Sequence, residues 1–529
     1  MRTLLINGRI YSPWAREASA LLVEDSTVGW LGDDASARVM SADLVVDLAG
    51  ALVVPAFVDA HFHATATGLQ LSGLDLSSTP SLDAALRLIE QHARRSGGRP
   101  MLGSGWDETR WPEGRAPSAA ELDRASYGGV VYLARTDAHS AVVSSALMAS
   151  VPGLRSMTGF RRDGRLTVEA HHAARAVAFS SITPGQRADL QQRALRHAAG
   201  LGVAAVHEMA GPEISSADDL AALLALSAGE PLPEVAGYWG ELRGTKAAAE
   251  LGAIGAAGDL FCDGSIGSHT AAVTEPYADL DSRGELRFDL GDVIEHIVAC
   301  TEAGLQAGFH AIGDAATAQV IQAMTTAAER LAPGRVTAAG HRIEHAELLS
   351  DIDAFARSGL IASMQPAFDS TWGGPDGMYA LRLGADRAAA MNPFSAVAEA
   401  GIPLAFGSDS PVTPVDPWQA VRAASYPTNP RHALSPRSAF TAHTRGGWRA
   451  ARADGDGSGT LQPGAPASYA IVEAGPLGVD ASDERVSRWS TDERAGLPGL
   501  PDLAPGTELP RCLRTVLRGR QIFDSGELG

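Results

Sequence analysis

The chain has 529 residues, of which 45% are hydrophobic and 20% are charged. These are ordinary values for a folded globular protein, and the length allows a barrel of about 250 residues with further domains. Asp and Glu outnumber Lys and Arg by 62 to 43, which gives a formal net charge of −19. This charge disfavours binding to nucleic acid or to an anionic membrane. We therefore expect a small-molecule substrate as the partner, and leave a homo-oligomer open.

Three features of the sequence favour the cytoplasm. The first residues, MRTLLINGRIYS, contain an apolar run too short for a secretory signal. No apolar stretch approaches the roughly 20 residues that a membrane-spanning helix needs. The three cysteines, Cys262, Cys300 and Cys512, are odd in number and widely spaced, which argues against a disulfide framework. We therefore predict a cytoplasmic protein.

Both ends of the chain have the pattern of short strands joined by turns. The candidate strands of residues 1–55 are Leu4–Ile6, Ala20–Val23, Val28–Leu31 and Leu44–Val46. The same pattern returns in residues 461–473 and 512–523. Because so short a segment buries too little surface to fold alone, we expect 1–55 and 446–529 to form one small β-domain beside a body of residues 56–445.

The first part of this body, residues 64–199, is too long for a loop. Helical spacing of apolar residues predicts a helix over Ser81–Ala93, with Ser81 as its cap, and a second helix over Thr183–Leu201. A strand-like run, Gly129–Ala134, lies between them. We therefore predict an inserted subdomain that follows the first strand of the body.

Strands and helices alternate along the rest of the body. The eight candidate strands are Phe57–His63, Val203–His207, Leu232–Tyr238, Leu260–Cys262, Leu305–His310, Ala339–His345, Leu360–Gln365 and Pro403–Phe406. The clearest helices between them are Val293–Ala303, Ala315–Arg330, Leu349–Ser358 and Pro393–Ala400. Eight β-α units predict an α/β fold of the (β/α)8 TIM-barrel type, with chemistry where the strands end.

Side chains that commonly bind metals close several of these strands. His61 and His63 are two residues apart, so they share one face of a strand. His310, His345 and Asp409 end three later strands. Because parallel barrel strands end at one rim, we expect all five to meet around a metal. Their ligand types suit zinc best, with iron, manganese and nickel as alternatives.

The chemistry implied by such a site is hydrolysis. A metal with open coordination positions lowers the pKa of a bound water to about 7 and supplies hydroxide, while it polarises a carbonyl. Asp409 is placed to take the proton of that water and pass it to the leaving group. We assign Asp409 and His345 to catalysis.

Five motifs in this order resemble amidohydrolase family 3, the YtcJ-like branch of the metal-dependent amidohydrolase superfamily. They are VPAFVDAHFH, FHAIGD, RIEHAE, GSDSP and LQPGAPASYAIVE. The resemblance implies a barrel beside a small β-sandwich built from both termini, and hydrolysis of amide-like C–N bonds. It also implies that His61, His63 and Asp409 hold one metal ion, and that His310 and His345 hold a second.

The sequence departs from the family at one position. Relatives often carry a carboxylated lysine that bridges two metals, a few residues before a DGS motif. Here the matching residue is Asp259, in GDLFCDGS. We therefore leave the number of ions at one or two, and consider Asp259, Cys262 and Glu208 as bridging or substitute ligands.

Four other residues are weaker candidates for contact with the substrate. They are Asp263 and Ser265, which follow a strand, Trp106 in the insertion, and Gln365 at the end of a strand. Our first hypothesis is a metal-dependent hydrolase of an amide-type bond, with N-formyl or N-acyl amines as the substrates that the resemblance suggests. The alternatives are a deaminase of an aminoheterocycle that uses the same site, and a barrel that serves as a non-catalytic scaffold.

Overall fold

The computed structural model describes residues 1–15, 17–332, 334–477 and 499–528. A sheet of eight parallel strands forms its centre, in the order β19-β18-β17-β16-β15-β14-β13-β7. The strands are β7 (Phe57–Phe62), β13 (Val203–Ala210), β14 (Glu234–Trp239), β15 (Gly255–Ala256), β16 (Gln306–Ala311), β17 (Arg342–His345), β18 (Ile361–Met364) and β19 (Leu404–Phe406). Just beyond β19, the Asp409 amide donates to the His61 carbonyl of β7 at 2.8 Å. The sheet therefore curls into a nearly closed barrel.

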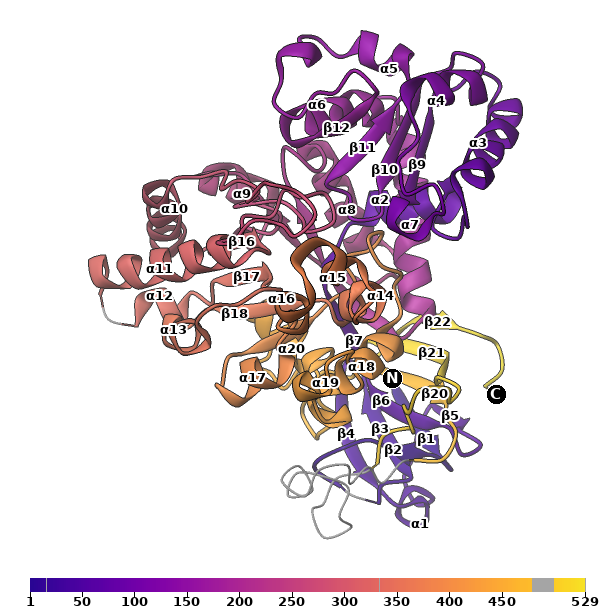
Figure 1. The fold of residues 1–529 in the computed structure, drawn as a ribbon. Helices are drawn as coiled ribbons and strands as arrows, with labels where there is room; N and C mark the ends of the chain where they lie inside the picture. Colours follow the sequence, from indigo (N-terminus) through magenta and orange to yellow (C-terminus); the bar gives the residue numbers. More distant parts are fainter. Residues whose placement is uncertain (16, 333, 478–498, 529) are drawn as a thin grey trace.

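Helices cover the outside of this barrel (Figure 1). The principal ones are α8 (Ala217–Gly229), α9 (Thr245–Leu251), α10 (Leu290–Ala303), α11 (Asp314–Arg330), α13 (Ile352–Ser358), α17 (Phe394–Glu399), α18 (Pro417–Ser425) and α20 (Arg445–Ala450). The shorter ones are α12 (Arg335–Ala338), α14 (Pro366–Trp372), α15 (Met378–Leu383), α16 (Ala385–Ala389) and α19 (Pro436–Ala442), whereas α1 (Asp34–Ala37) packs on the N-terminal strands away from the barrel. The predicted (β/α)8 class is confirmed, and the four helices named from the sequence coincide with α10, α11, α13 and α17.

One predicted strand is wrong. The sequence placed the fourth strand at Leu260–Cys262, whereas the structure forms it at Gly255–Ala256. Gly255 pairs with Tyr238 on one side and Gln306 on the other, and a Cβ there would lie 2.8 Å from the Gln306 carbonyl oxygen. A two-residue strand of small side chains has no apolar pattern to detect, while the apolar run that follows it makes only an isolated bridge, from Phe261 to His310.

The two ends of the chain pair with each other, at the bottom of Figure 1. One sheet, β4-β3-β1-β5, contains only N-terminal strands: β1 (Arg2–Ile6), β3 (Ala20–Glu24), β4 (Thr27–Gly32) and β5 (Leu44–Asp47). The other, β2-β6-β20-β21-β22, joins both ends: β2 (Arg9–Ile10), β6 (Leu52–Pro55), β20 (Tyr469–Glu473), β21 (Arg511–Leu517) and β22 (Arg520–Asp524). Both sheets contribute to one hydrophobic core. The boundaries 1–55, 56–445 and 446–529 stay predictions, and residues 478–498 and 529 lie outside the described part.

The insertion forms a third unit, at the top of Figure 1. Its sheet, β12-β11-β10-β9-β8, consists of β8 (Leu74–Asp75), β9 (Met101–Trp106), β10 (Val131–Arg135), β11 (Ser140–Val143) and β12 (Arg165–Thr167). Its helices are α2 (Ala64–Ser72), α3 (Leu82–Ser96), α4 (Ala119–Ala125), α5 (Ser145–Ser150), α6 (Val168–Phe179) and α7 (Pro184–Gly200). Ser81 caps α3 and Thr183 caps α7, as the sequence indicates, because each hydroxyl accepts a hydrogen bond from a first-turn amide. None of the helices in the described ranges is both long and apolar enough to span a bilayer.

Candidate metal centre

Six buried side chains meet where five barrel strands end. We call them the central cluster: His61, His63, Asp259, His310, His345 and Asp409. The sequence predicted five of them as ligands and named the sixth, Asp259, as a substitute. Strand β7 supplies the first two, and β15, β16, β17 and β19 or the residues just after them supply the others. The parallel barrel therefore brings together residues almost 350 positions apart, because its strands end at one rim.

The backbone turns sharply at two of these residues. His345 has φ of 72° and Asp409 has φ of 53°, in the left-handed region that non-glycine residues seldom adopt. Such conformations cost free energy and concentrate at functional sites. Here they allow a strand to end while its last polar side chain still faces the rim.

Asp259 lies at the centre of the cluster. Its Oδ1 is 3.4 Å from His61 Nε2, 3.5 Å from His310 Nδ1 and 3.8 Å from His345 Nε2. Its Oδ2 is 3.1 Å from His63 Nε2. One carboxylate thus faces four imidazoles. Its side chain is shorter than that of the lysine that relatives often carry at the matching position.

Asp409 approaches the same group from the side of the first strand. Its Oδ1 lies 3.1 Å from His63 Nε2 and 3.5 Å from His61 Nε2. Three overlapping trios within the cluster have donor atoms that all lie within 4.8 Å of one another. They are His61 with His345 and Asp409, His61 with His63 and Asp259, and Asp259 with His310 and His345.

Hydrogen bonds fix the orientation of three imidazoles. The outer nitrogen of His61, Nδ1, lies 3.0 Å from Glu344 Oε2, and that of His345, Nδ1, lies 2.8 Å from Gln365 Oε1. Nε2 of His310 lies 3.2 Å from the Gly264 carbonyl oxygen. Because each of these partners accepts, each outer nitrogen carries the proton, and the inner nitrogen keeps a free lone pair.

The inner atoms have the character of metal ligands. Within the described part of the chain, His61 Nε2, His310 Nδ1, His345 Nε2 and Asp259 Oδ1 have no hydrogen-bond partner although they are buried. Buried polar atoms without partners are costly and call for an explanation such as an ion. Imidazole nitrogens with acceptors behind them, facing carboxylates, fit a divalent transition metal.

The electrostatics of the central cluster also fit a metal site. Burial disfavours charge on His61 and His63, but Asp259 and Asp409 outweigh it, raising the pKa of His63 to about 9 and that of His61 well above its usual value. Burial also opposes charge on the two carboxylates, but the pKa of each is lowered, chiefly by His61. The pocket therefore retains positive charge, which protons or a metal can carry.

The structure does not bring two of the proposed substitute ligands into the central cluster. Cys262 is fully buried in the hydrophobic core of the barrel, where burial raises the pKa of its thiol. The Glu208 carboxylate accepts a hydrogen bond of 2.7 Å from the Ala64 amide at the start of α2. Burial raises the pKa of Glu208 to about 8. Neither residue belongs to a potential metal-binding trio in the described chain.

The four weaker candidates also have structural roles. Asp263 accepts from the amides of Ala272, Ile312 and Gly313, and so ties its loop to the end of β16. Trp106 is fully buried and donates to the Leu133 carbonyl, so it does not line the cavity. Gln365 orients His345 as described above. Ser265 donates to Asp137 and lines a second, smaller cavity beside the cluster. Contact with a substrate stays a prediction for all four residues.

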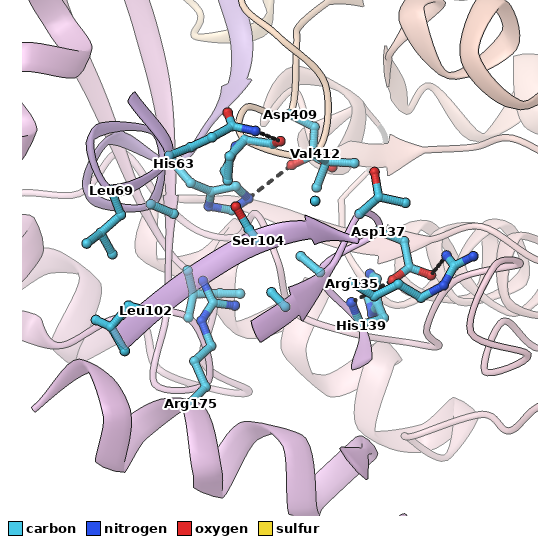
Figure 2. Close-up of a pocket in the computed structure, with 18 of the residues that line it drawn as sticks. His63, Leu69, Leu102, Ser104, Arg135, Asp137, His139, Arg175, Asp409 and Val412 are labelled. Carbon is cyan, nitrogen blue, oxygen red and sulfur yellow. Dashed lines mark hydrogen bonds and ion pairs between the residues drawn. The ribbon is translucent and has the colours of Figure 1, made fainter. Parts of the chain in front are cut away.

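A larger cavity opens on the central cluster from the insertion. All of the cluster residues except His61 line it. Figure 2 shows side chains of the insertion, among them Leu102, Ser104, His139 and Arg175, gathered around it. The barrel supplies the cluster and the insertion supplies most of the opposing wall, so the insertion is placed to contact a substrate.

Sequence reasoning missed the partners that orient the cluster. Glu344 accepts a hydrogen bond from His61 Nδ1, and Arg342 donates to both oxygens of Glu344. Both lie fully buried in RIEHAE, where only His345 was noticed. Charged residues two apart in a buried strand were a usable signal, because buried charges are rare unless paired. His139 of the insertion, which lines the large cavity, also has its ring centroid 4.7 Å from that of His310.

The comparison with known families agrees with this arrangement. A profile described as "Amidohydrolase family" matches residues 44–523. The chain belongs to the amidohydrolase family. The amidohydrolase is therefore a metal-dependent hydrolase that acts on carbon–nitrogen bonds, which confirms the resemblance drawn from the motifs and sets aside the scaffold.

Individual relatives share much of this amidohydrolase's sequence. Putative amidohydrolase YtcJ of Bacillus subtilis (strain 168) is 26% identical over 413 residues, covering 72% of this chain and 74% of YtcJ. An N-substituted formamide deformylase of Arthrobacter pascens is 29% identical over 152 residues, covering 27% and 28%. The crystal structure of an uncharacterized metal-dependent hydrolase from Pyrococcus horikoshii OT3 has 28% identity and a TM-score of 0.71, covering 90% of this chain and 98% of that one.

Proposed function

We propose that this amidohydrolase cleaves the amide bond of an N-formyl or N-acyl amine, with zinc as its metal. The observation that carries the proposal is the central cluster itself, in which inward-facing imidazole nitrogens without hydrogen-bond partners surround Asp259. The deformylase from Arthrobacter pascens supports the choice of substrate, over the part of the chain that it matches.

The resemblance to the family suggests how the ligands would divide, and the distances are compatible with it. His61, His63 and Asp409 would hold one ion and His310 and His345 a second, and Asp259 lies within reach of both sets. A divalent metal supplies Lewis-acid chemistry here, by lowering the pKa of water to about 7 and by polarising the carbonyl. Because Asp259 is shorter than the bridging lysine of relatives, the number of metal ions per chain is one or two, and metal analysis of the purified protein determines it.

The residues of the chain then move the protons. Asp409 borders the large cavity, so its carboxylate can accept a proton from the attacking water and return it to the leaving nitrogen. Gln365 and Glu344 keep the protons of His345 and His61 on the outer nitrogens, which leaves the inner lone pairs available. The apolar residues of the insertion exclude bulk water from the cavity.

The test is a substrate screen combined with metal analysis. We expect stoichiometric zinc in purified protein, and turnover among N-formyl amines, N-acetyl amines, cyclic amides and aminoheterocycles, with the first two classes preferred. Asp409→Asn is expected to lower kcat at least about 10²-fold, because the proton acceptor is lost. Retained turnover in this variant, at the metal content of the wild type, would remove Asp409 from its role. Preferred turnover of aminoheterocycles would favour the deaminase instead.

A further inference from the structure

The large cavity contains two arginines with different surroundings. Arg135 is surrounded by acidic side chains: its guanidinium lies 2.9 to 3.2 Å from carboxylate oxygens of Asp107, Glu108 and Asp137. Its charge is therefore neutralised within the protein. Arg175, on α6, lines the same cavity but has no carboxylate partner among the described residues.

Arg175 is a buried cation that faces open space. Its side chain is only 9% exposed, and it extends from α6 towards the cavity (Figure 2). Within the described residues it makes no hydrogen bond or ion pair, and its closest recorded partner is the ring of Phe179, 5.3 Å from the guanidinium carbon. The acidic side chain of Asp219 pairs with Arg187 instead, at 3.0 Å.

An unpaired buried guanidinium needs a reason. Removing a charge from water without a counter-ion is costly, and arginine stays protonated in proteins, so it cannot escape the cost by neutralisation. The cost is recovered when a bound molecule brings the missing anion. A guanidinium binds a carboxylate through two parallel hydrogen bonds, and these charge-assisted bonds are strong.

We propose that Arg175 binds the carboxylate of the substrate while its amide lies at the central cluster, so that the substrates are N-formyl or N-acyl amino acids. This inference rests on the proposed function. A single guanidinium matches the single charge of a carboxylate, whereas a phosphate dianion would leave one charge unpaired. Water adds to the acyl carbon, the C–N bond breaks and the nitrogen takes a proton, which yields a carboxylic acid and a free amino acid.

The walls of the cavity agree with a substrate of this class. Apolar and aromatic side chains line the same cavity as Arg175: Leu69, Leu102, Tyr132, Phe179 and Ile214. They would contact an apolar amino-acid side chain. The cation comes from the insertion and the metal ligands from the barrel, so the two parts of the chain would hold the two ends of one molecule.

Matched substrates test the inference. We would compare kcat/KM for both enantiomers of N-formyl- and N-acetyl-leucine with that for the corresponding amides of isopentylamine, which lack only the carboxylate. The wild type is expected to prefer the acids at least about 30-fold, as an interaction of about 2 kcal/mol with a charged group predicts. Arg175→Met should abolish the preference, mainly through KM, and Arg175→Lys should keep part of it. Arg124→Met, on the exposed face of α4, is the control for the loss of one positive charge, and it should leave kcat/KM and the preference for the acids unchanged.

Binding separates this inference from the proposed function. Calorimetry with N-acetyl-leucine and N-acetyl-isopentylamine in the Asp409→Asn background, with and without Arg175→Met, would measure affinity without turnover. If the acid binds more tightly only when Arg175 is present, the carboxylate site stands even without hydrolysis. If neutral amides are hydrolysed as well as the acids and Arg175→Met changes nothing, the inference fails while the hydrolase stands.

Stability provides a further check on the variants. Because Arg175 has no carboxylate partner in the described chain, Arg175→Met should unfold at the same temperature as the wild type or higher. A large fall in that temperature would show that the guanidinium has a structural role and would count against the inference. If the phosphonate analogue of the acid inhibits more tightly than the acid itself, the anion that Arg175 binds is phosphate-like, and the assignment to a carboxylate is wrong.

Discussion

The residues behind the metal ligands decide which nitrogen of each imidazole faces the ion. Glu344, Gln365 and the Gly264 carbonyl occupy the outer nitrogens of His61, His345 and His310. The ligands could be predicted from the sequence because each ends a recognisable strand. Of their partners, Glu344 had a usable signal as a charged residue in a buried strand, whereas Gln365 and Gly264 acquire these roles only when separate segments of the chain meet.

Gln365 allows the role of such a partner to be measured. Gln365→Met removes the acceptor from His345 Nδ1, so the ring loses its preferred tautomer, and metal affinity should fall about 10-fold or more. Gln365→Glu keeps an oxygen at that place, and the Nε2 atom it replaces has no hydrogen-bond partner in the described chain, so affinity should be retained. Competition with a chelating dye measures both. Equal affinity in Gln365→Met and the wild type would contradict this assignment.

Among the elements, α2 connects the central cluster to the insertion. It begins at Ala64, directly after His63, and packs along α7. At Gly68 the backbones lie so close that a Cβ would be 2.2 Å from the carbonyl oxygen of Leu190. The position of His63 therefore depends on a glycine whose neighbours are backbone atoms, which cannot move aside as a flexible side chain would.

Gly68→Ala should accordingly disturb both stability and the metal site. Because the helices must separate, the free energy of unfolding is expected to fall by about 2 kcal/mol or more, with weaker metal binding through His63. Gly185→Ala, in the first turn of α7, is the matched control, since a Cβ there has nothing within 4 Å. It should leave stability unchanged or raise it by about 0.5 kcal/mol. Urea unfolding at a fixed zinc concentration compares the two, and equal stabilities would refute the close-packing argument.

Elements with strong local signals were predictable, and those set by their neighbours were not. Helix α7 has Thr183 as its cap, Pro184 in its first turn and Gln186 to complete the capping box, so its start could be located from the sequence. Strand β15 is two small residues held between β14 and β16. Its position, and hence that of Asp259 at the cluster, is determined by the closure of the barrel.

At the scale of the whole molecule, folding buries several neutral histidines outside the central cluster. Burial lowers the pKa of His296 and of His443 to about 4, and that of His341 to about 3. All three side chains are almost completely inaccessible. In the unfolded chain each would titrate near 6.5, so unfolding takes up protons in mildly acidic solution.

His341 shows why the folded barrel resists that proton. Its Nδ1 accepts from the Ala307 amide at 2.7 Å, and its Nε2 lies 2.8 Å from Thr301 Oγ1. The Thr301 hydroxyl already donates to the Ile297 carbonyl, so it must accept the Nε2 proton. A second proton on the ring would break the bond from Ala307.

The stability that His341 contributes should therefore depend on pH. The unfolded state binds the proton first, so this contribution is complete above pH 6.5 and is lost as the pH falls towards 3. Between pH 7 and pH 5 the loss is about 2 kcal/mol for this residue. His341→Asn keeps an acceptor for the Ala307 amide but does not titrate, so its stability should fall by about 2 kcal/mol less over this interval. Urea unfolding of the wild type and of His341→Asn at both pH values measures the difference. Any effect of metal release is the same in both proteins and cancels, because the central cluster is unchanged. If stability depends on pH equally in the two proteins, His341 takes up its proton in the folded chain and the prediction is wrong.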